Sequence, residues 1–69
     1  MTLNQLKYAI VVSESESFNI AAKKLYISQP SLSTSIHALE EEVGIQIFRR
    51  SQNGIAVTPD GKEFLGYAR

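Results

Sequence analysis

Short, uncharged, hydrogen-bonding side chains gather between residues 28 and 37, where the sequence reads SQPSLSTSIH. At about 100° per residue, Pro30, Thr34 and His37 fall on one face of a helix, with Ser31 and Ser33 beside them. Such a face lets a helix lie deep in a DNA groove about 12 Å wide, whereas long charged side chains would hold it away. The pattern therefore predicts a helix that reads base edges, and the alternative is that these residues only solvate a helix start.

Gln29 stands at the start of this segment and is the first candidate for base readout. Its amide offers a donor and an acceptor together, which match the N6 and N7 edge of adenine. The start of a helix also presents free backbone amides and a partial positive charge, and both suit a nearby phosphate. His37 is either a base or phosphate contact or a solvent-facing residue.

Net charge alone does not favour a nucleic-acid partner, because the seven basic and seven acidic residues of the 69-residue chain cancel. Three of the acids form one run at residues 40–42, which is typical of a solvated helix end, and without it the chain is net positive. Glu41 would be repelled by phosphates. We therefore expect the helix to enter a groove by its N-terminal end.

The residue inventory excludes the common catalytic and metal-binding classes. The chain has no cysteine and a single histidine, so a thiol nucleophile and a histidine-rich metal cluster are both missing. Asp60 and Glu63 lie one turn apart, but acids near a helix N-terminus are the commoner explanation. We expect no enzyme, no cofactor and no metal. With 43% apolar residues, no long apolar run and no secretory signal, we expect a cytoplasmic protein with no membrane contact.

A first helix is expected from Leu3 to about Ser15, with Thr2 and Gln5 forming a capping box at its start. Serine and glutamate residues then break the pattern. Helical spacing predicts one buried face that comprises Leu3, Leu6, Ile10 and Ser13 and is widened by Ala9 and Val12.

A short second helix is expected through Ala21, Ala22 and Leu25, with Phe18 as a core anchor and Ser17 or Asn19 as its cap. About three residues separate it from the next helix, which is the connection length of a helix-turn-helix, although no glycine marks the turn.

The third helix is expected over residues 28–43, because Ser28 followed by Pro30 is a strong start signal and Gly44 suits a left-handed end. Its apolar stripe comprises Leu32, Ile36, Leu39 and Val43.

Residues 47–57 change period and predict two short strands around a turn at Asn53 and Gly54. Arg49 and Arg50 alternate in side, so one faces a duplex while the other packs inward. We expect Arg50 to be the inner one, paired with a glutamate of the third helix.

A fourth helix is expected to open at Pro59, with Thr58 as its N-cap and Asp60 in its first turn. This helix has no end signal before Arg69. We therefore expect the chain to be the N-terminal domain of a longer polypeptide.

Taken together, these residues resemble the LysR-type transcriptional regulators of bacteria across essentially the whole chain. The similarity lies in the order and spacing of several short motifs. They are Ser17-Phe18 with Ala21-Ala22, Ser28-Gln29-Pro30-Ser31-Leu32-Ser33, Ile36, Leu39-Glu40, Val43-Gly44, Ile47-Phe48 with Arg50, and Thr58-Pro59 with Gly61.

The resemblance implies a mainly α winged helix-turn-helix that binds double-stranded DNA, with residues 28–43 in the major groove and the wing, residues 47–57, at the minor groove. It implies a DNA-binding domain over residues 1–58 and the start of a linker and dimerisation helix over residues 59–69. Base readout is then expected from Gln29, Pro30, Ser33, Thr34 and His37, and backbone or wing contacts from Ser28, Ser31, Lys23, Arg49, Arg50, Gln52 and Asn53.

The implied partners are a palindromic operator half-site, a second copy joined through the helix that starts at Pro59, and a higher oligomer in the full-length protein. A small-molecule effector would bind a domain that this sequence lacks. Many members carry arginine where Thr34 stands and near Asn53, so readout by arginine is expected to be weaker here. The alternative from another class is a winged-helix module that binds a protein, and the zero net charge keeps it open.

Overall fold

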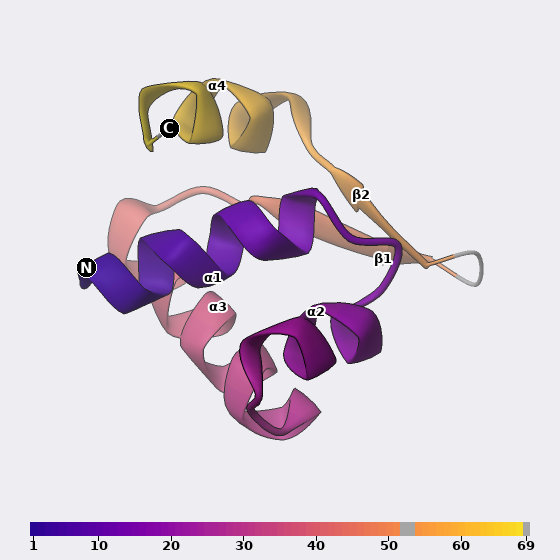
Figure 1. Cartoon of the computed structure of the whole chain (residues 1–69). Coiled ribbons are helices and arrows are strands. Elements are labelled where there is room, and N and C mark those ends of the chain that lie inside the picture. Colours follow the sequence, from indigo (N-terminus) through magenta and orange to yellow (C-terminus); the bar gives the residue numbers. More distant parts are fainter. Residues whose placement is uncertain (52–53, 69) are drawn as a thin grey trace.

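The described chain consists of four helices and a two-stranded antiparallel sheet. The computed structural model describes residues 1–51 and 54–68. The elements follow in the order α1 (Leu3–Ser13), α2 (Phe18–Leu25), α3 (Gln29–Val43), β1 (Phe48–Ser51), β2 (Gly54–Val57) and α4 (Pro59–Ala68). In Figure 1, α1 crosses the middle, α2 and α3 lie on one side of it, α4 lies on the other, and the hairpin extends outward as an arm. This arrangement confirms the predicted winged helix-turn-helix.

Side-chain caps start the first three helices where the sequence predicts them. Thr2 and Gln5 form the capping box of α1, with both reciprocal bonds at 3.0 Å. Ser17 caps α2 by accepting from Ile20 N, so Ser17 rather than Asn19 has this role. Ser28 caps α3 and Gly44 ends it with φ of 77°. The register of the helix that carries the candidate readout residues is therefore fixed by local sequence.

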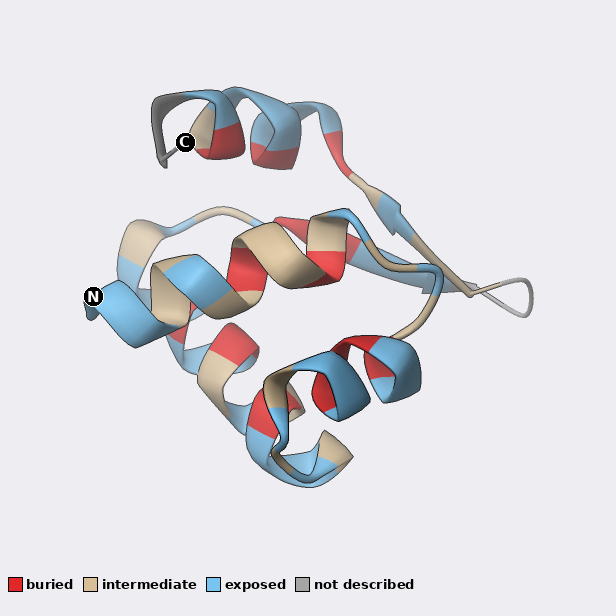
Figure 2. Ribbon diagram, in the orientation of Figure 1, coloured by how far each residue is buried: buried red, intermediate tan, exposed pale blue. Residues whose placement is uncertain are grey.

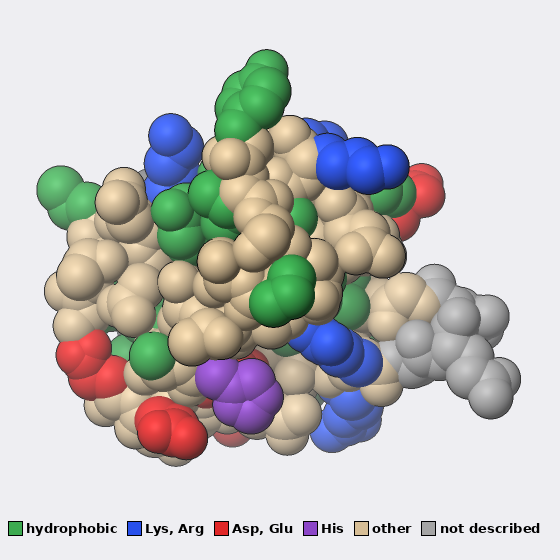
Figure 3. Space-filling model, turned by 90° about the horizontal axis from the view of Figure 1, so that it is seen from below, with side chains coloured by type: hydrophobic (Ala, Val, Ile, Leu, Met, Phe, Trp, Pro, Cys, Tyr) green, Lys and Arg blue, Asp and Glu red, His purple; other side chains and the backbone are tan. Residues whose placement is uncertain are grey.

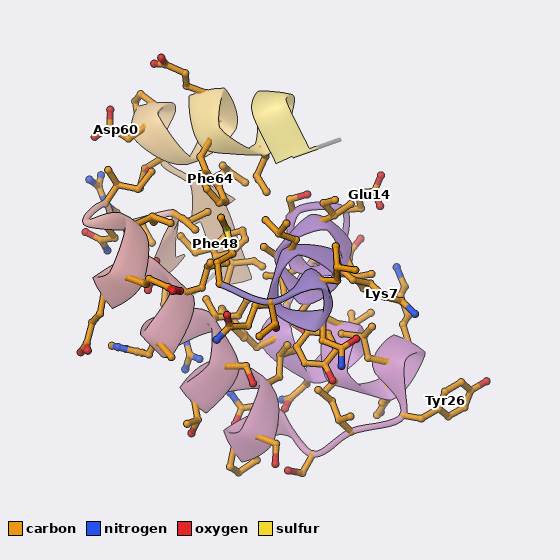
Figure 4. The ribbon with its side chains drawn as sticks, turned by 90° about the vertical axis from the view of Figure 1, so that its left-hand side faces the viewer. Lys7, Glu14, Tyr26, Phe48, Asp60 and Phe64 are labelled. Carbon is orange, nitrogen blue, oxygen red and sulfur yellow. The ribbon has the colours of Figure 1, made fainter. Side chains whose placement is uncertain are left out.

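The turn between α2 and α3 contains Tyr26 in the left-handed conformation, with φ of 58°. A residue without a Cβ penalty, usually glycine, commonly takes this conformation at a helix end. The absence of glycine therefore does not prevent the tight helix-turn-helix connection. The Tyr26 side chain is 95% exposed and points away from the body of the molecule (Figure 4).

The core lies between the three helices of the bundle and the base of the hairpin, where the buried surfaces of the ribbon face one another (Figure 2). Leu32, Ile36 and Leu39 of α3 are buried as predicted, and Phe18 anchors α2. The fully buried or nearly buried apolar residues are Ala9, Val12, Phe18, Ala21, Ala22, Leu32, Ile36, Leu39, Ile47, Phe48 and Leu65.

The buried face predicted for α1 was wrong, because it was centred on Leu3, Leu6 and Ile10 rather than on Ala9 and Val12. Ala9 and Val12 are fully buried, whereas Leu3 is 85% exposed and Leu6 and Ile10 are only partly buried. Because α1 is apolar on several sides, its own periodicity does not select a face. The selection comes from the close packing of small and β-branched side chains against α2 and α3. The helix also ends at Ser13, two residues earlier than predicted.

The start of α4 is fastened to the segment that leads into β1. Thr58 Oγ1 accepts from Gly61 N at 2.9 Å, which confirms the predicted cap, and Thr58 N donates to Ile47 O at 2.9 Å. Gly61 lies against the same carbonyl, and a Cβ there would stand 2.4 Å from Ile47 O. Leu65 then enters the core. Within residues 1–51 and 54–68, no helix is long and apolar enough to cross a membrane.

Candidate nucleic-acid interface

The outer face of α3 is exposed along most of its length. Pro30, Ser31, Thr34 and His37 are all exposed, while Gln29 and Ser33 are half-buried at the edge toward the hairpin. In Figure 3 the middle of this side of the molecule is mostly uncharged, and Lys and Arg side chains lie at its margin. The structure thus presents the uncharged surface that the sequence predicts.

The first turn of α3 is ordered by its own serines. Ser31 N donates to Ser28 Oγ at 3.2 Å, and the Ser28 hydroxyl donates to Ser31 Oγ at 2.8 Å. Ser31 N and Leu32 N are both satisfied internally, the latter by Ser28 O at 3.1 Å, and Pro30 has no N–H, but this end of α3 still carries the positive pole of the helix dipole. The Ser31 hydroxyl hydrogen, which can donate, and this dipole end form a surface that suits an anion such as a phosphate.

Gln29, Ser33 and Arg50 form one hydrogen-bonded chain that joins α3 to the hairpin. Gln29 Nε2 donates to Ser33 Oγ at 2.7 Å. The Arg50 guanidinium donates to the same oxygen through Nη2. Its central carbon also lies 4.1 Å from the centre of the Phe18 ring, which makes a cation–π contact. Phe18 in turn packs edge-to-face on Phe48 of β1, with ring centres 6.0 Å apart.

The inner partner predicted for Arg50 was wrong. Arg50 lies toward α3 while it stays exposed, and it reaches Ser33 and the Phe18 ring rather than a glutamate of α3. The available glutamate is engaged elsewhere: Glu40 Oε2 accepts from Ile47 N at 2.7 Å and from Phe48 N at 3.1 Å. The Glu40 carboxylate therefore accepts from the residue just before β1 and from the first residue of β1.

Sequence reasoning missed this role of Glu40, which it grouped with the solvated acids of residues 40–42. The two neighbours differ from it. Glu41 is exposed, and Glu42 pairs with the Met1 amine at the surface. The one available signal is the spacing of seven residues between Ser33 and Glu40, which places both on the side of α3 that faces the hairpin.

The remaining predicted contact residues lie around the α3 surface. Lys23 is exposed in the last turn of α2, and Arg49 is exposed on β1. Lys24, beside Lys23, reaches Ser15 Oγ at 3.4 Å. Gln52 and Asn53, which follow β1 in the sequence, lie outside the described residues.

A helix-turn-helix with a two-stranded wing and an exposed, uncharged α3 face defines a winged helix-turn-helix protein, and comparison with known proteins gives the family. Residues 3–62 match the family described as "Bacterial regulatory helix-turn-helix protein, lysR family". The chain belongs to this family, which confirms the resemblance.

Two relatives illustrate the match. The HTH-type transcriptional regulator TfdT of Cupriavidus pinatubonensis is 44% identical over 69 residues, which cover 100% of this chain and 30% of TfdT. The HTH-type transcriptional regulator BenM of Acinetobacter baylyi is 47% identical over 68 residues, which cover 99% of this chain and 22% of BenM. The chain thus spans less than a third of the length of these curated relatives.

Solved structures match the fold closely. The CbnR DNA-binding domain in its complex with DNA gives a TM-score of 0.95 at 42% identity, covering 100% of this chain and 79% of that one. The BenM DNA-binding domain with catB site 1 DNA gives a TM-score of 0.91 at 47% identity, covering 99% of this chain and 73% of that one.

Proposed function

We propose that this chain binds double-stranded DNA in a sequence-specific manner, with the N-terminal half of α3 in the major groove. The observation that carries the proposal is the exposed, uncharged face of Pro30, Ser31, Thr34 and His37 on a helix whose opposite stripe is buried in the core. Two structures similar to this chain at 42% and 47% identity hold DNA, which supports the same use of the fold here.

Within this proposal, Gln29 reads a base pair, and Pro30, Ser33, Thr34 and His37 contribute contacts or shape at neighbouring base edges. Ser28 and Ser31, at the positive end of α3, and Lys23 and Arg49, on either side, contact phosphates. Arg50, Gln52 and Asn53 belong to the wing, residues 47–57, which we place over the minor groove.

We further propose that residues 1–58 act as the DNA-binding domain and that residues 59–69 begin a linker helix through which two copies pair on a palindromic operator. The function that we propose for the chain is then transcriptional regulation in the cytoplasm, without catalysis. A longer parent protein would add an effector-binding domain and a higher oligomer. The support for these points is membership of the family and the small share of its relatives that the chain covers.

A duplex titration at several salt concentrations tests the DNA proposal. Phosphate neutralisation releases counterions, so the logarithm of the affinity falls linearly with the logarithm of the salt concentration. We expect a steep slope and, after selection from a random duplex pool, one enriched sequence. A shallow slope with no enriched duplex would favour the alternative, a winged-helix module that binds a protein.

A further inference from the structure

Ser33 sits where two donors meet, and this limits what it can offer to DNA. A serine hydroxyl has two acceptor lone pairs and one hydrogen. Gln29 Nε2 and the Arg50 guanidinium both donate to its oxygen, so both acceptor positions are occupied. Only the hydroxyl hydrogen remains for another partner. Ser33 is therefore better suited to hold its neighbours than to accept a bond from a base.

The same contact fixes what Gln29 presents. Its amide nitrogen carries two hydrogens, and one of them is directed to Ser33. The second N–H and the carbonyl oxygen Oε1 have no other partner among the described residues. A donor and an acceptor side by side are what the N7 and N6 positions of adenine require. The orientation of this amide therefore decides which base it can read.

Arg50 has no ion pair among residues 1–51 and 54–68, where the N-terminus and Glu42 form the recorded pair. Its guanidinium is located by the face of Phe18, itself 7% exposed and packed on Phe48. Arg50 is exposed, but the ring against which its guanidinium lies is buried, so a fixed part of the core sets the position of its bond to Ser33.

We propose that Arg50 is a specificity-determining positioning residue: from the hairpin it holds Ser33, and through Ser33 it fixes the amide of Gln29. This inference rests on the proposed function, because only a duplex gives the amide a base to read. Arg50 then influences sequence preference without touching the base, and the hairpin takes part in major-groove readout.

Binding to two duplexes tests this role. The first is the duplex that the unaltered chain selects. The second differs from it at one base pair, the one at which the Gln29→Ala variant loses sequence preference. Discrimination between them should fall about 5- to 150-fold in Gln29→Ala, because one bidentate contact contributes about 1 to 3 kcal/mol. Arg50→Met and Ser33→Ala should each reduce the discrimination at that pair by about threefold or more, a measurable fraction of the bidentate contribution. Ser33→Thr, which keeps the hydroxyl, should retain it.

The double variant separates a shared pathway from two independent contacts. If Arg50 acts through Ser33, then Ser33→Ala with Arg50→Met should lose no more discrimination than either change alone. The matched control is Arg49→Met, which should weaken binding to both duplexes alike and make the salt slope shallower by about one unit. Multiplicative losses in the double variant, or unchanged discrimination in Arg50→Met, would overturn the proposal.

A measurement without DNA keeps this inference distinct from the proposed function. The side-chain amide resonances of Gln29 in the nitrogen–proton NMR spectrum of the free chain should move in Arg50→Met and Ser33→Ala, but not in Arg49→Met. Unmoved resonances would show that the network does not hold the amide, whatever the chain binds. If the Gln29 resonances shift as expected but no duplex is selected, the hydrogen-bond network is supported and the proposed function fails.

Discussion

The two ends of α3 carry opposite kinds of side chain and do different work. The N-terminal end exposes Pro30, Ser31 and Thr34, none of which is charged. The C-terminal end carries three consecutive acids, of which Glu40 holds the hairpin, Glu42 pairs with the chain terminus and Glu41 is exposed. We therefore distinguish an N-terminal end of α3, proposed to bind DNA, from a C-terminal end that anchors the hairpin. Changes at the anchoring end should alter folding, and changes at the binding end should alter affinity.

The largest effect is expected at Glu40. Glu40→Ala leaves the amides of Ile47 and Phe48 without their carboxylate partner in a part of the molecule that is 0% and 5% exposed. The free energy of unfolding should fall by roughly 2 to 4 kcal/mol, measured by urea denaturation. Glu40→Gln keeps one acceptor oxygen and should lose about half as much. Glu41→Ala is the matched control and should change stability by less than about 0.5 kcal/mol. Equal losses of unfolding free energy in Glu40→Ala and Glu41→Ala would contradict the anchoring role of Glu40.

At the binding end, Gln29→Ala should weaken binding to the selected duplex by about 1 to 3 kcal/mol while leaving the unfolding midpoint in place. Replacing the adenine of that base pair by 7-deazaadenine removes the N7 acceptor. This DNA change should weaken the unaltered chain and have little further effect on the variant. A full additional loss in the variant would mean that another residue reads the pair.

Ser28 belongs to both roles, since it caps α3 and borders the expected phosphate. Ser28→Ala should lower the free energy of unfolding by about 1 kcal/mol because the bond from Ser31 N is lost. Ser28→Asp keeps a good cap, so stability should be retained, yet the added negative charge should weaken duplex binding at low salt. Unchanged duplex binding in Ser28→Asp would place the phosphate elsewhere.

The smallest effect is expected at Glu41. Its exposed carboxylate lies on the outer side of α3 and should repel a bound duplex from about one Debye length. Glu41→Gln should raise affinity by about twofold on every sequence, in a titration at low salt. The gain should vanish at high salt. A change in sequence preference would instead indicate a direct base contact.

Local signals predicted most of the fold. Thr2, Ser28 and Gly44 mark helix ends through contacts within three or four residues, so sequence alone locates them. The buried apolar stripe of α3 could also be predicted, because polar residues surround it in the sequence. In α1 the apolar residues occupy several sides, and the buried ones, Ala9 and Val12, are chosen by the helices that pack on them.

Long-range contacts account for what the sequence did not reveal. Glu40 meets Ile47 and Phe48 seven and eight residues away, after a helix end and a change of direction. Arg50 meets Ser33 at a separation of seventeen. Strand alternation favoured Arg50 as the inner arginine of β1, but its partners, Ser33 and the Phe18 ring, became visible only in the folded structure. Residue types were enough to predict the candidate contact residues. Their hydrogen-bond partners depended on how the hairpin folds back on α3.

Backbone amide NMR of the chain titrated with its selected duplex would locate the surface in contact most directly. The largest shift changes are expected in residues 28–38, with smaller ones near Lys23 and Arg49 and little change in α1 and α4. Shift changes concentrated on α1 and α4, with residues 28–38 unmoved at saturation, would contradict the assignment of α3 to the groove.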